Sequence, residues 1–158
     1  MAEPRVEKAY EKHAWIFLFV WGILWLLYGF FLFIIPTPEL STPFESIAGI
    51  PWSELVASSP RVANVLIYLT RGFGVLALVA SIFFIAVAAK SYRRGERWAW
   101  YTAWSLPVLG GTFLALDVSS GAGGSYALFY DALFLILPLA GLLLPYRKFF
   151  PKKQVAPS

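Results

Sequence analysis

Long apolar stretches alternate with short polar ones along the chain, and this pattern predicts four membrane-spanning helices. The first apolar run is unbroken over residues 14–35. A second covers 62–89, of which we assign 65–89 to a span, and two more cover 98–116 and 126–144. A run of 22 residues extends about 33 Å as a helix, enough to cross a hydrocarbon core about 30 Å thick. We therefore expect an all-α, polytopic membrane four-helix bundle.

The polar segments connect these spans into a single membrane domain over residues 1–158. Residues 36–61 contain several prolines and three glutamates and lack a clear apolar period, which predicts a long external loop. Only residues 53–56 suggest a short interfacial helix there. A serine- and glycine-rich turn joins the last two spans, and residues 146–158 form a cytoplasmic tail.

Lysine and arginine residues flank the spans almost entirely on one side. Of the 13 in the chain, eleven lie in the amino-terminal segment, in the 90–97 connection or in the tail, and only Arg61 flanks a span on the opposite side. Because such an excess marks the cytoplasmic side of a membrane protein, both termini are predicted to be cytoplasmic in a multi-pass cell-membrane protein. The acidic loop 36–61 is then outside.

The composition narrows the possible chemistry. With 59% apolar and 14% charged residues, the chain is outside the range of soluble domains. The absence of cysteine and the single histidine exclude thiolate chemistry, cysteine-bound zinc and bis-histidine haem within one copy. No phosphate-binding loop, His-Glu-x-x-His or Gly-x-Ser-x-Gly motif is present. We therefore expect no catalytic residue, no metal and no cofactor, and favour a non-enzymatic role.

The net charge of +4 does not indicate nucleic-acid binding, because the cations lie beside predicted spans. Anionic lipid headgroups are the partners expected there. The residues predicted to contact lipid at the inner interface are Arg93, Arg94, Arg97, Trp98, Trp100, Arg147 and Lys148.

Two motifs carry a resemblance to known proteins: Arg-Gly-Phe-Gly at 71–74, and Arg-Arg-Gly-Glu-Arg-Trp-Ala-Trp at 93–100. With these the segment 65–118 resembles a group of small, uncharacterised prokaryotic four-helix integral membrane proteins. The resemblance implies a prokaryotic source and the same fold, but no reaction and no ligand. Few amides, one methionine and no cysteine fit a thermophilic source, although membrane spans disfavour amides in any case.

Charges inside spans are costly and are therefore the first place to look for function. Three residues qualify: Arg71, Asp117 and Asp131. At a rise of about 1.5 Å per residue, all three fall in one layer, about 24–28 Å above the cytoplasmic edge. Tyr68 and Tyr130 lie near the same layer, either as hydrogen-bond donors or as part of an ordinary aromatic belt.

Three interpretations of this layer stay open. Arg71 could pair with one aspartate and hold two spans in register, in which case Asp131→Asn should lower thermal stability and a second change at Arg71 should restore part of it. Alternatively, the layer could form an outward-facing pocket in which Arg71 binds an anionic headgroup or substrate. In the third, Arg71 extends to the outer interface without a partner.

Small residues and prolines indicate how the spans pack. Positions 74, 77, 81 and 88 of the second span are Gly, Ala, Ser and Ala, a stripe that permits close helix approach. Pro107 and Pro138 interrupt the third and fourth spans. Because proline lacks an N–H, each leaves a carbonyl that another helix or a water molecule must satisfy. The first span is aromatic on all sides, which suits either lipid or a larger partner such as a subunit, pigment or quinone.

Three functions follow from these features. The first is a non-catalytic accessory or structural subunit of a larger membrane complex. The second is a small lipophile- or anion-binding membrane protein or enzyme that uses Arg71, Asp117 and Asp131. The third is a channel or carrier formed by a homo-oligomer, which the small-residue stripe permits.

Overall fold

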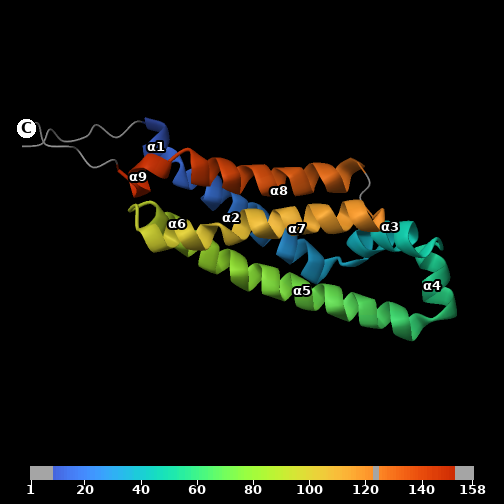
Figure 1. Ribbon diagram of the computed structural model, residues 1–158. Helices are drawn as coiled ribbons and strands as arrows, with labels where there is room; N and C mark the ends of the chain where they lie inside the picture. Colours follow the sequence, from blue (N-terminus) through green and yellow to red (C-terminus); the bar gives the residue numbers. More distant parts are fainter. Residues whose placement is uncertain (1–8, 123–124, 152–158) are drawn as a thin grey trace, which may run out of the picture.

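The computed structural model describes residues 9–122 and 125–151, and all regular structure within these ranges is helical, as predicted. Four long helices lie side by side (Figure 1): α2 (Trp15–Ile34), α5 (Pro60–Val87), α7 (Ser105–Ser120) and α8 (Ser125–Leu143). Shorter elements complete the described fold: α1 (Ala9–His13), α3 (Thr37–Ala48), α4 (Trp52–Ser58), the π-helix η1 (Ala88–Tyr92), α6 (Arg97–Ala103) and α9 (Tyr146–Phe149).

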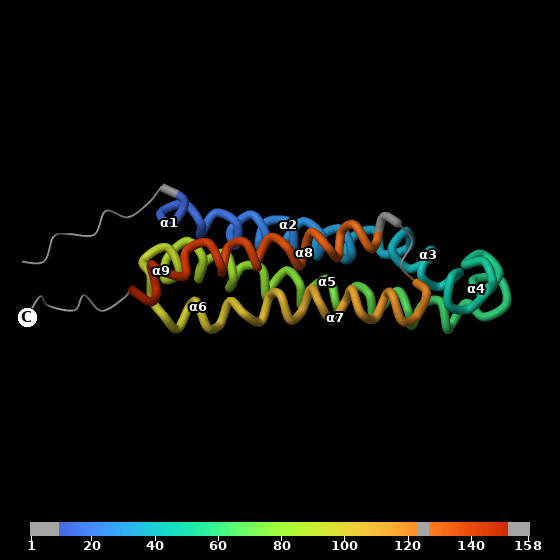
Figure 2. The backbone as a smooth tube through the Cα atoms, turned by 45° about the horizontal axis from the view of Figure 1, so that its top comes forward, coloured from blue at the N-terminus to red at the C-terminus, as the bar shows by residue number. Residues whose placement is uncertain are grey.

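The two ends of the helix assembly differ in the elements they carry (Figures 1 and 2). We call the end with α1, η1, the start of α6 and α9 the terminal end, and the end with α3, α4 and Gly121 the loop end. The described cations that flank the predicted spans on the cytoplasmic side all lie at the terminal end, in α1, η1, α6, α9 or the turn between η1 and α6. The remaining predicted cytoplasmic cations, Arg5, Lys8, Lys152 and Lys153, lie outside the described residues.

Two helical stretches are long and apolar enough to cross a membrane, Tyr10–Ile34 and Pro60–Tyr92. A third apolar helix, Ala127–Leu143, is shorter. The predicted span 98–116 is divided in two, because α6 ends at Ala103 and α7 begins at Ser105. Pro107 explains the division, since it has no N–H to donate to the carbonyl of Ala103 four residues earlier.

The helices α2 and α5 approach each other closely where two glycines face each other. A Cβ atom on Gly74 would lie 2.8 Å from the carbonyl oxygen of Gly29 and 2.9 Å from the backbone nitrogen of Phe33. Residues 74, 77, 81 and 88 are all buried, which confirms the small-residue stripe as a packing surface. No larger residue fits at this crossing without moving the backbone.

Side chains from other helices satisfy carbonyls that prolines leave free. Pro138 cannot donate to the carbonyl of Phe134, and Trp21 Nε1 donates to this oxygen at 3.0 Å instead. Pro145 likewise leaves the carbonyl of Gly141, to which the Tyr92 hydroxyl donates at 2.6 Å. Tyr92 and Trp21 are each 1% exposed and lie in the main apolar core. The sequence-based expectation for Pro138 is thus confirmed, and the partner is a helix.

The segment 36–61 was expected to be mostly irregular but is mostly helical, because all of its prolines except Pro43, which lies inside α3, are at helix beginnings. Pro36 precedes the first helical residue of α3, and Pro38 lies in its first turn, where an N–H has no partner in the helix. Gly49, with φ of +70°, ends α3 in the left-handed conformation. The short helix expected at 53–56 is present as α4.

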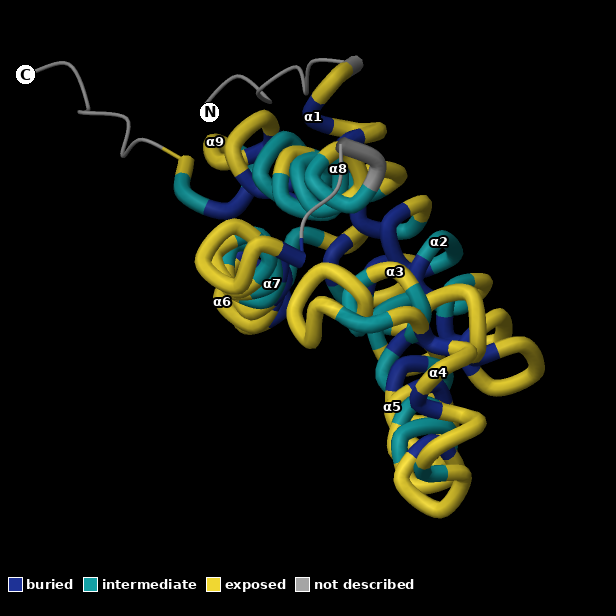
Figure 3. Tube along the Cα trace, turned by 90° about the vertical axis from the view of Figure 1, so that its right-hand side faces the viewer, coloured by how far each residue is buried: buried dark blue, intermediate teal, exposed yellow. Residues whose placement is uncertain are grey.

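A small second core joins α3 and α4 to the beginning of α5. It is built from buried Trp52, Leu55 and Ala63, with partly buried Leu40, Phe44, Leu66 and Ile67 packed against it. Figure 3 shows that α4 and the beginning of α5 are otherwise largely exposed and lie away from α7 and α8. The loop end is therefore held together by α3, α4 and α5, not by the main bundle core.

Candidate functional site

A short hydrogen bond joins α2 to α3 at the loop end. Tyr28, in the last two turns of α2, donates its hydroxyl to Glu39 Oε1 at 2.6 Å. The bond is short because the acceptor is a carboxylate. It fixes the first turn of α3 over the end of α2, across the bend at Pro36.

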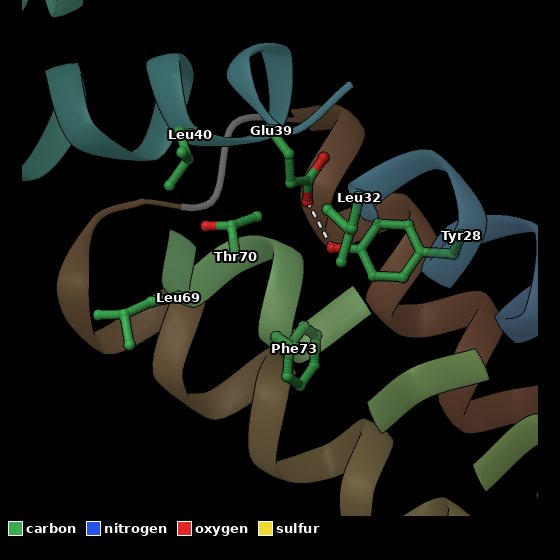
Figure 4. Close-up of a pocket in the computed structure, with 7 residues that line it drawn as sticks. All are labelled: Tyr28, Leu32, Glu39, Leu40, Leu69, Thr70 and Phe73. Atoms are coloured by element: carbon green, nitrogen blue, oxygen red, sulfur yellow. Dashed lines mark hydrogen bonds between the residues drawn. The ribbon is translucent and has the colours of Figure 1, made fainter. Parts of the chain in front are cut away.

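A cavity of about 310 Å³ opens beside this hydrogen bond (Figure 4). Three of its lining residues are polar at their ends and four are apolar: Tyr28, Glu39 and Thr70, and Leu32, Leu40, Leu69 and Phe73. They come from α2, α3 and α5. The Thr70 hydroxyl donates to the carbonyl of Leu66 at 3.0 Å, so its oxygen retains capacity to accept. The cavity thus joins an apolar wall to one polar edge.

Two aspartates lie near this edge on the neighbouring helices. Asp117 of α7 and Asp131 of α8 lie close enough to act electrostatically on each other and on the Tyr28 hydroxyl. Asp131 Oδ2 is buried and has no hydrogen-bond partner among the described residues. Two neighbouring carboxylates repel each other when both are ionised, so this part of the bundle is acidic and incompletely satisfied.

The structure does not place Arg71 with these aspartates. Its side chain is exposed on α5, and no ion pair to it exists within residues 9–122 and 125–151. Tyr68, 75% exposed, lies three residues away on the same face of α5. Tyr130, 56% exposed, lies on α8 against the ring of Phe129. Of the five predicted layer residues, only the two aspartates come together.

Sequence reasoning missed two polar residues of the cavity, Tyr28 and Glu39, as members of a site. Tyr28 was part of an aromatic span, and Glu39 was one of three loop glutamates. The sequence did contain a signal for the rotation of α5 about its axis. The small-residue stripe that includes Gly74 and Ala77 reaches Thr70 when it is extended by four residues toward the N-terminus, which places Arg71 outside the packed face.

At the terminal end, the residues predicted to contact lipid divide into two groups. Trp100 is only 8% exposed and donates its indole N–H to the carbonyl of Leu142 at 3.1 Å, so it belongs to the core. Arg97 donates Nε–H to the carbonyl of Phe149 at 3.1 Å and lies over the ring of Phe150. These two residues hold α6 against α8 and α9.

The other predicted contact residues face outward. Arg93, Arg94, Trp98, Arg147 and Lys148 are exposed or partly exposed at the terminal end. The indole N–H of Trp98 donates to the Glu96 carboxylate at 2.6 Å. This hydrogen bond, with further contributions from the Ser91 hydroxyl, Arg94 and Lys90, holds the pKa of Glu96 below its usual range.

Within residues 9–122 and 125–151, no group of three histidine, cysteine or carboxylate side chains is arranged to hold a metal ion. Comparison with family models, curated proteins and solved structures gives no match for this chain. The function is therefore argued from the geometry alone.

Proposed function

We propose that this chain is an integral membrane protein that crosses the bilayer four times and binds an amphiphilic molecule in the loop-end cavity. Membrane insertion rests on where the apolar residues lie. In the most apolar windows of Tyr10–Ile34 and Pro60–Tyr92 only 33% and 22% of residues are buried within the protein. A core helix of a soluble protein buries its apolar face, so these exposed faces favour lipid as their environment.

The four-span topology is the arrangement that best accounts for the charges. In it α6 and α7 together form the third span and α8 the fourth. The cation-rich terminal end lies in the cytoplasm, and the loop end, with its carboxylates, lies outside. Both termini are then cytoplasmic. In this orientation the cavity of Figure 4 opens at the level of the outer leaflet.

The proposal that the protein binds a ligand rests on the loop-end cavity. Its apolar wall suits a hydrocarbon chain, and its polar edge offers the Glu39 carboxylate and the Thr70 oxygen as acceptors. Small-molecule sites commonly combine an apolar lining with a few polar groups that fix orientation. Among the described residues that line the cavity, Glu39 alone is charged, and the aspartates nearby are also acidic. The expected ligand therefore carries a hydroxyl or cationic head, and an anionic head is disfavoured.

Photocrosslinking tests this proposal. The full-length protein in bilayer nanodiscs is exposed to a long-chain amine, the matching alcohol and the matching carboxylic acid, each with a diazirine in the chain. Peptide mass mapping should place amine and alcohol adducts on Leu40 and Leu69, with the acid labelling several-fold less. Equal labelling by the acid, or adducts spread along all helices, would contradict the site.

Matched variants sharpen this experiment. Glu39→Gln and Leu69→Ala should reduce labelling at the cavity. Glu54→Gln, an exposed carboxylate of α4, and Leu76→Ala, an exposed leucine of α5 outside the cavity, should not. Leu69 and Leu76 are 58% and 68% exposed, so this pair separates the cavity from general lipid contact.

A second candidate function is the accessory subunit of a larger membrane complex, and the exposed face of α5 favours it. Arg71 lies there beside Gly72, where an added Cβ atom would meet nothing within 4 Å, and Tyr68 flanks both. A small residue beside an exposed cation suits an acidic partner helix that packs closely. Gentle solubilisation and native mass measurement should then give a stoichiometric complex that dissociates in Arg71→Leu. A homodimer would favour self-association, and a lone monomer would contradict the subunit role.

A further inference from the structure

The turn that follows α5 is a π-helix, and it directs a set of cations outward. The backbone N–H of Arg93 donates to the carbonyl of Ala88 at 3.2 Å, five residues earlier. Such wide turns are uncommon and often occur at functional sites. Tyr92 is buried and tied to α8 through Gly141, which fixes the rotation of η1 about its axis.

A cavity of about 390 Å³ lies on the outward face of this turn, and its lining is cationic. It is formed by Ala89, Lys90, Arg93 and Arg94. Their spacing places all four on one side of the helix. The alanine leaves room between the three long side chains. This volume is within the range of cavities that bind small ligands.

Two contacts restrict the side chains around the cavity in the unliganded protein. The Arg93 guanidinium lies over the Trp15 ring, 5.2 Å from its centroid, which restricts its rotamers while leaving its N–H donors available. Glu96 interacts electrostatically with Arg94 and Lys90, but its carboxylate is held by Trp98. The described lining therefore holds three cations and no carboxylate.

The surface next to the cavity is apolar and continues along α5. Ile82 and Phe83 are 60% and 68% exposed, and Ala86 is exposed between them and the cavity. Positions 82, 86, 89 and 93 follow helical spacing, so an apolar stripe leads directly to the cations. A ligand with acyl chains could lie along this stripe while its head occupies the cavity.

We propose that this cavity binds the headgroup of a doubly anionic phospholipid, with two phosphate groups, in the cytoplasmic leaflet. Arginine donates two parallel N–H groups to phosphate oxygens, and lysine adds a compact charge. Three lining cations match a head with two phosphate groups better than a head with a single phosphate. Basic pockets on the cytoplasmic side of membrane helices are suited to such lipids. The leaflet assignment rests on the orientation given under Proposed function.

The test is lipid binding by the full-length protein in detergent micelles, followed by native mass spectrometry and thermal unfolding. Cardiolipin, phosphatidylglycerol and phosphatidylcholine with the same oleoyl chains are titrated separately. Cardiolipin should bind several-fold more tightly than phosphatidylglycerol and should raise the unfolding temperature, because it relieves repulsion among the cations. Arg94→Gln and Lys90→Gln should each weaken cardiolipin binding about fivefold.

The matched control is Lys12→Gln, an exposed cation of α1 at the same end that does not line the cavity. It should change the affinity less than twofold. Arg93→Gln also removes the contact to Trp15, so Arg93→Lys is measured beside it and should retain most of the binding. Equal loss in Lys12→Gln and Arg94→Gln would show general charge attraction and overturn the proposal.

Two further measurements distinguish a lipid phosphate from a soluble phosphate, and this inference from the proposed function. Pyrophosphate that displaces cardiolipin at similar concentrations would point to a soluble ligand and overturn the lipid assignment. Glu39→Gln, at the opposite end, should leave cardiolipin binding unchanged. If amine crosslinking at the loop-end cavity fails but cardiolipin binds selectively, the proposed function is wrong and the lipid-binding inference stands. If crosslinking succeeds but cardiolipin does not bind selectively, the lipid-binding inference is wrong and the proposed function stands.

Discussion

The two ends of the bundle are built from different interactions. At the terminal end, Tyr92, Trp100 and Arg97 each donate to a backbone carbonyl of α8 or α9, and aromatic rings fill the space between them. At the loop end, helices α3 and α4 have a small core of their own, and Asp131 Oδ2 lacks a partner among the described residues. Where the polar groups are hydrogen-bonded, as these three are at the terminal end, they hold the helices together. Where a polar group beside a cavity lacks a partner within the part of the chain that the structure describes, as at the loop end, a ligand can supply one.

The largest expected effect comes from the glycine crossing beneath the loop-end cavity. Gly74→Ala would place a methyl group 2.8 Å from the Gly29 carbonyl oxygen and force α5 away from α2. We expect a loss of about 1–3 kcal/mol in the free energy of unfolding, typical of overpacking. Gly72→Ala is the matched control two residues away, where a methyl group meets open space, and it should be neutral or slightly stabilising. Equal effects at both positions would show that the crossing does not hold α5.

The next effect compares one tyrosine at each end. Tyr92→Phe leaves the buried Gly141 carbonyl without a donor and should cost about 1–2 kcal/mol of unfolding free energy. Tyr28→Phe removes a more accessible hydrogen bond to Glu39 and should cost less than about 1 kcal/mol, because water can replace the donor. In a Pro145→Ala background the new N–H can reach the Gly141 carbonyl, so Tyr92→Phe should cost less there. Chemical denaturation in detergent compares the wild type with Tyr92→Phe, Tyr28→Phe, Pro145→Ala and the Pro145→Ala/Tyr92→Phe double variant. A larger loss for Tyr28→Phe than for Tyr92→Phe would reverse the comparison.

A smaller effect, of opposite sign, is expected at the aspartate pair. Asp131 lies beside Asp117 and away from Arg71, so Asp131→Asn removes like-charge repulsion and supplies an amide donor to Asp117. The thermal stability at pH 7 should rise by the equivalent of about 0.5–1 kcal/mol. An Arg71–Asp131 ion pair predicts the reverse, a loss that Arg71→Leu partly restores. Thermal unfolding of the single and double variants distinguishes the two arrangements.

The smallest effect concerns Glu96, whose pKa is lowered mainly by the hydrogen bond from Trp98. A carboxylate with a lowered pKa in the folded protein stabilises it fully above the unfolded-state pKa, near 4.5, and this contribution disappears as the pH falls through the lower folded-state pKa. Glu96 is only partly buried, and solvent screens its carboxylate, so the change should be slight. Glu96→Gln should flatten the pH dependence of the unfolding temperature below about pH 4.5. An unchanged pH profile would show that the Trp98 contact does not form in solution.

The sequence predicted the positions of the long helices well because apolar runs and prolines determine where helices start and stop. It predicted the depth of Arg71 and Asp131 from their distance along each helix, but depth does not determine the rotation of a helix about its axis. That rotation is determined by the Gly74 crossing with α2, which turns Thr70 inward and Arg71 outward. The pairing of Tyr28 with Glu39 depends on the fold of α3 across Pro36, which no local pattern in residues 36–61 indicated.

The central claim is that the two ends lie on opposite sides of a membrane, and the cysteine-free chain allows a direct measurement. Ser46→Cys in α3 and Lys12→Cys in α1, both exposed, each introduce the only thiol. In intact cells a membrane-impermeant maleimide should label Ser46→Cys, and it should label Lys12→Cys only after permeabilisation. Labelling of both variants, or of neither, before permeabilisation would contradict the account.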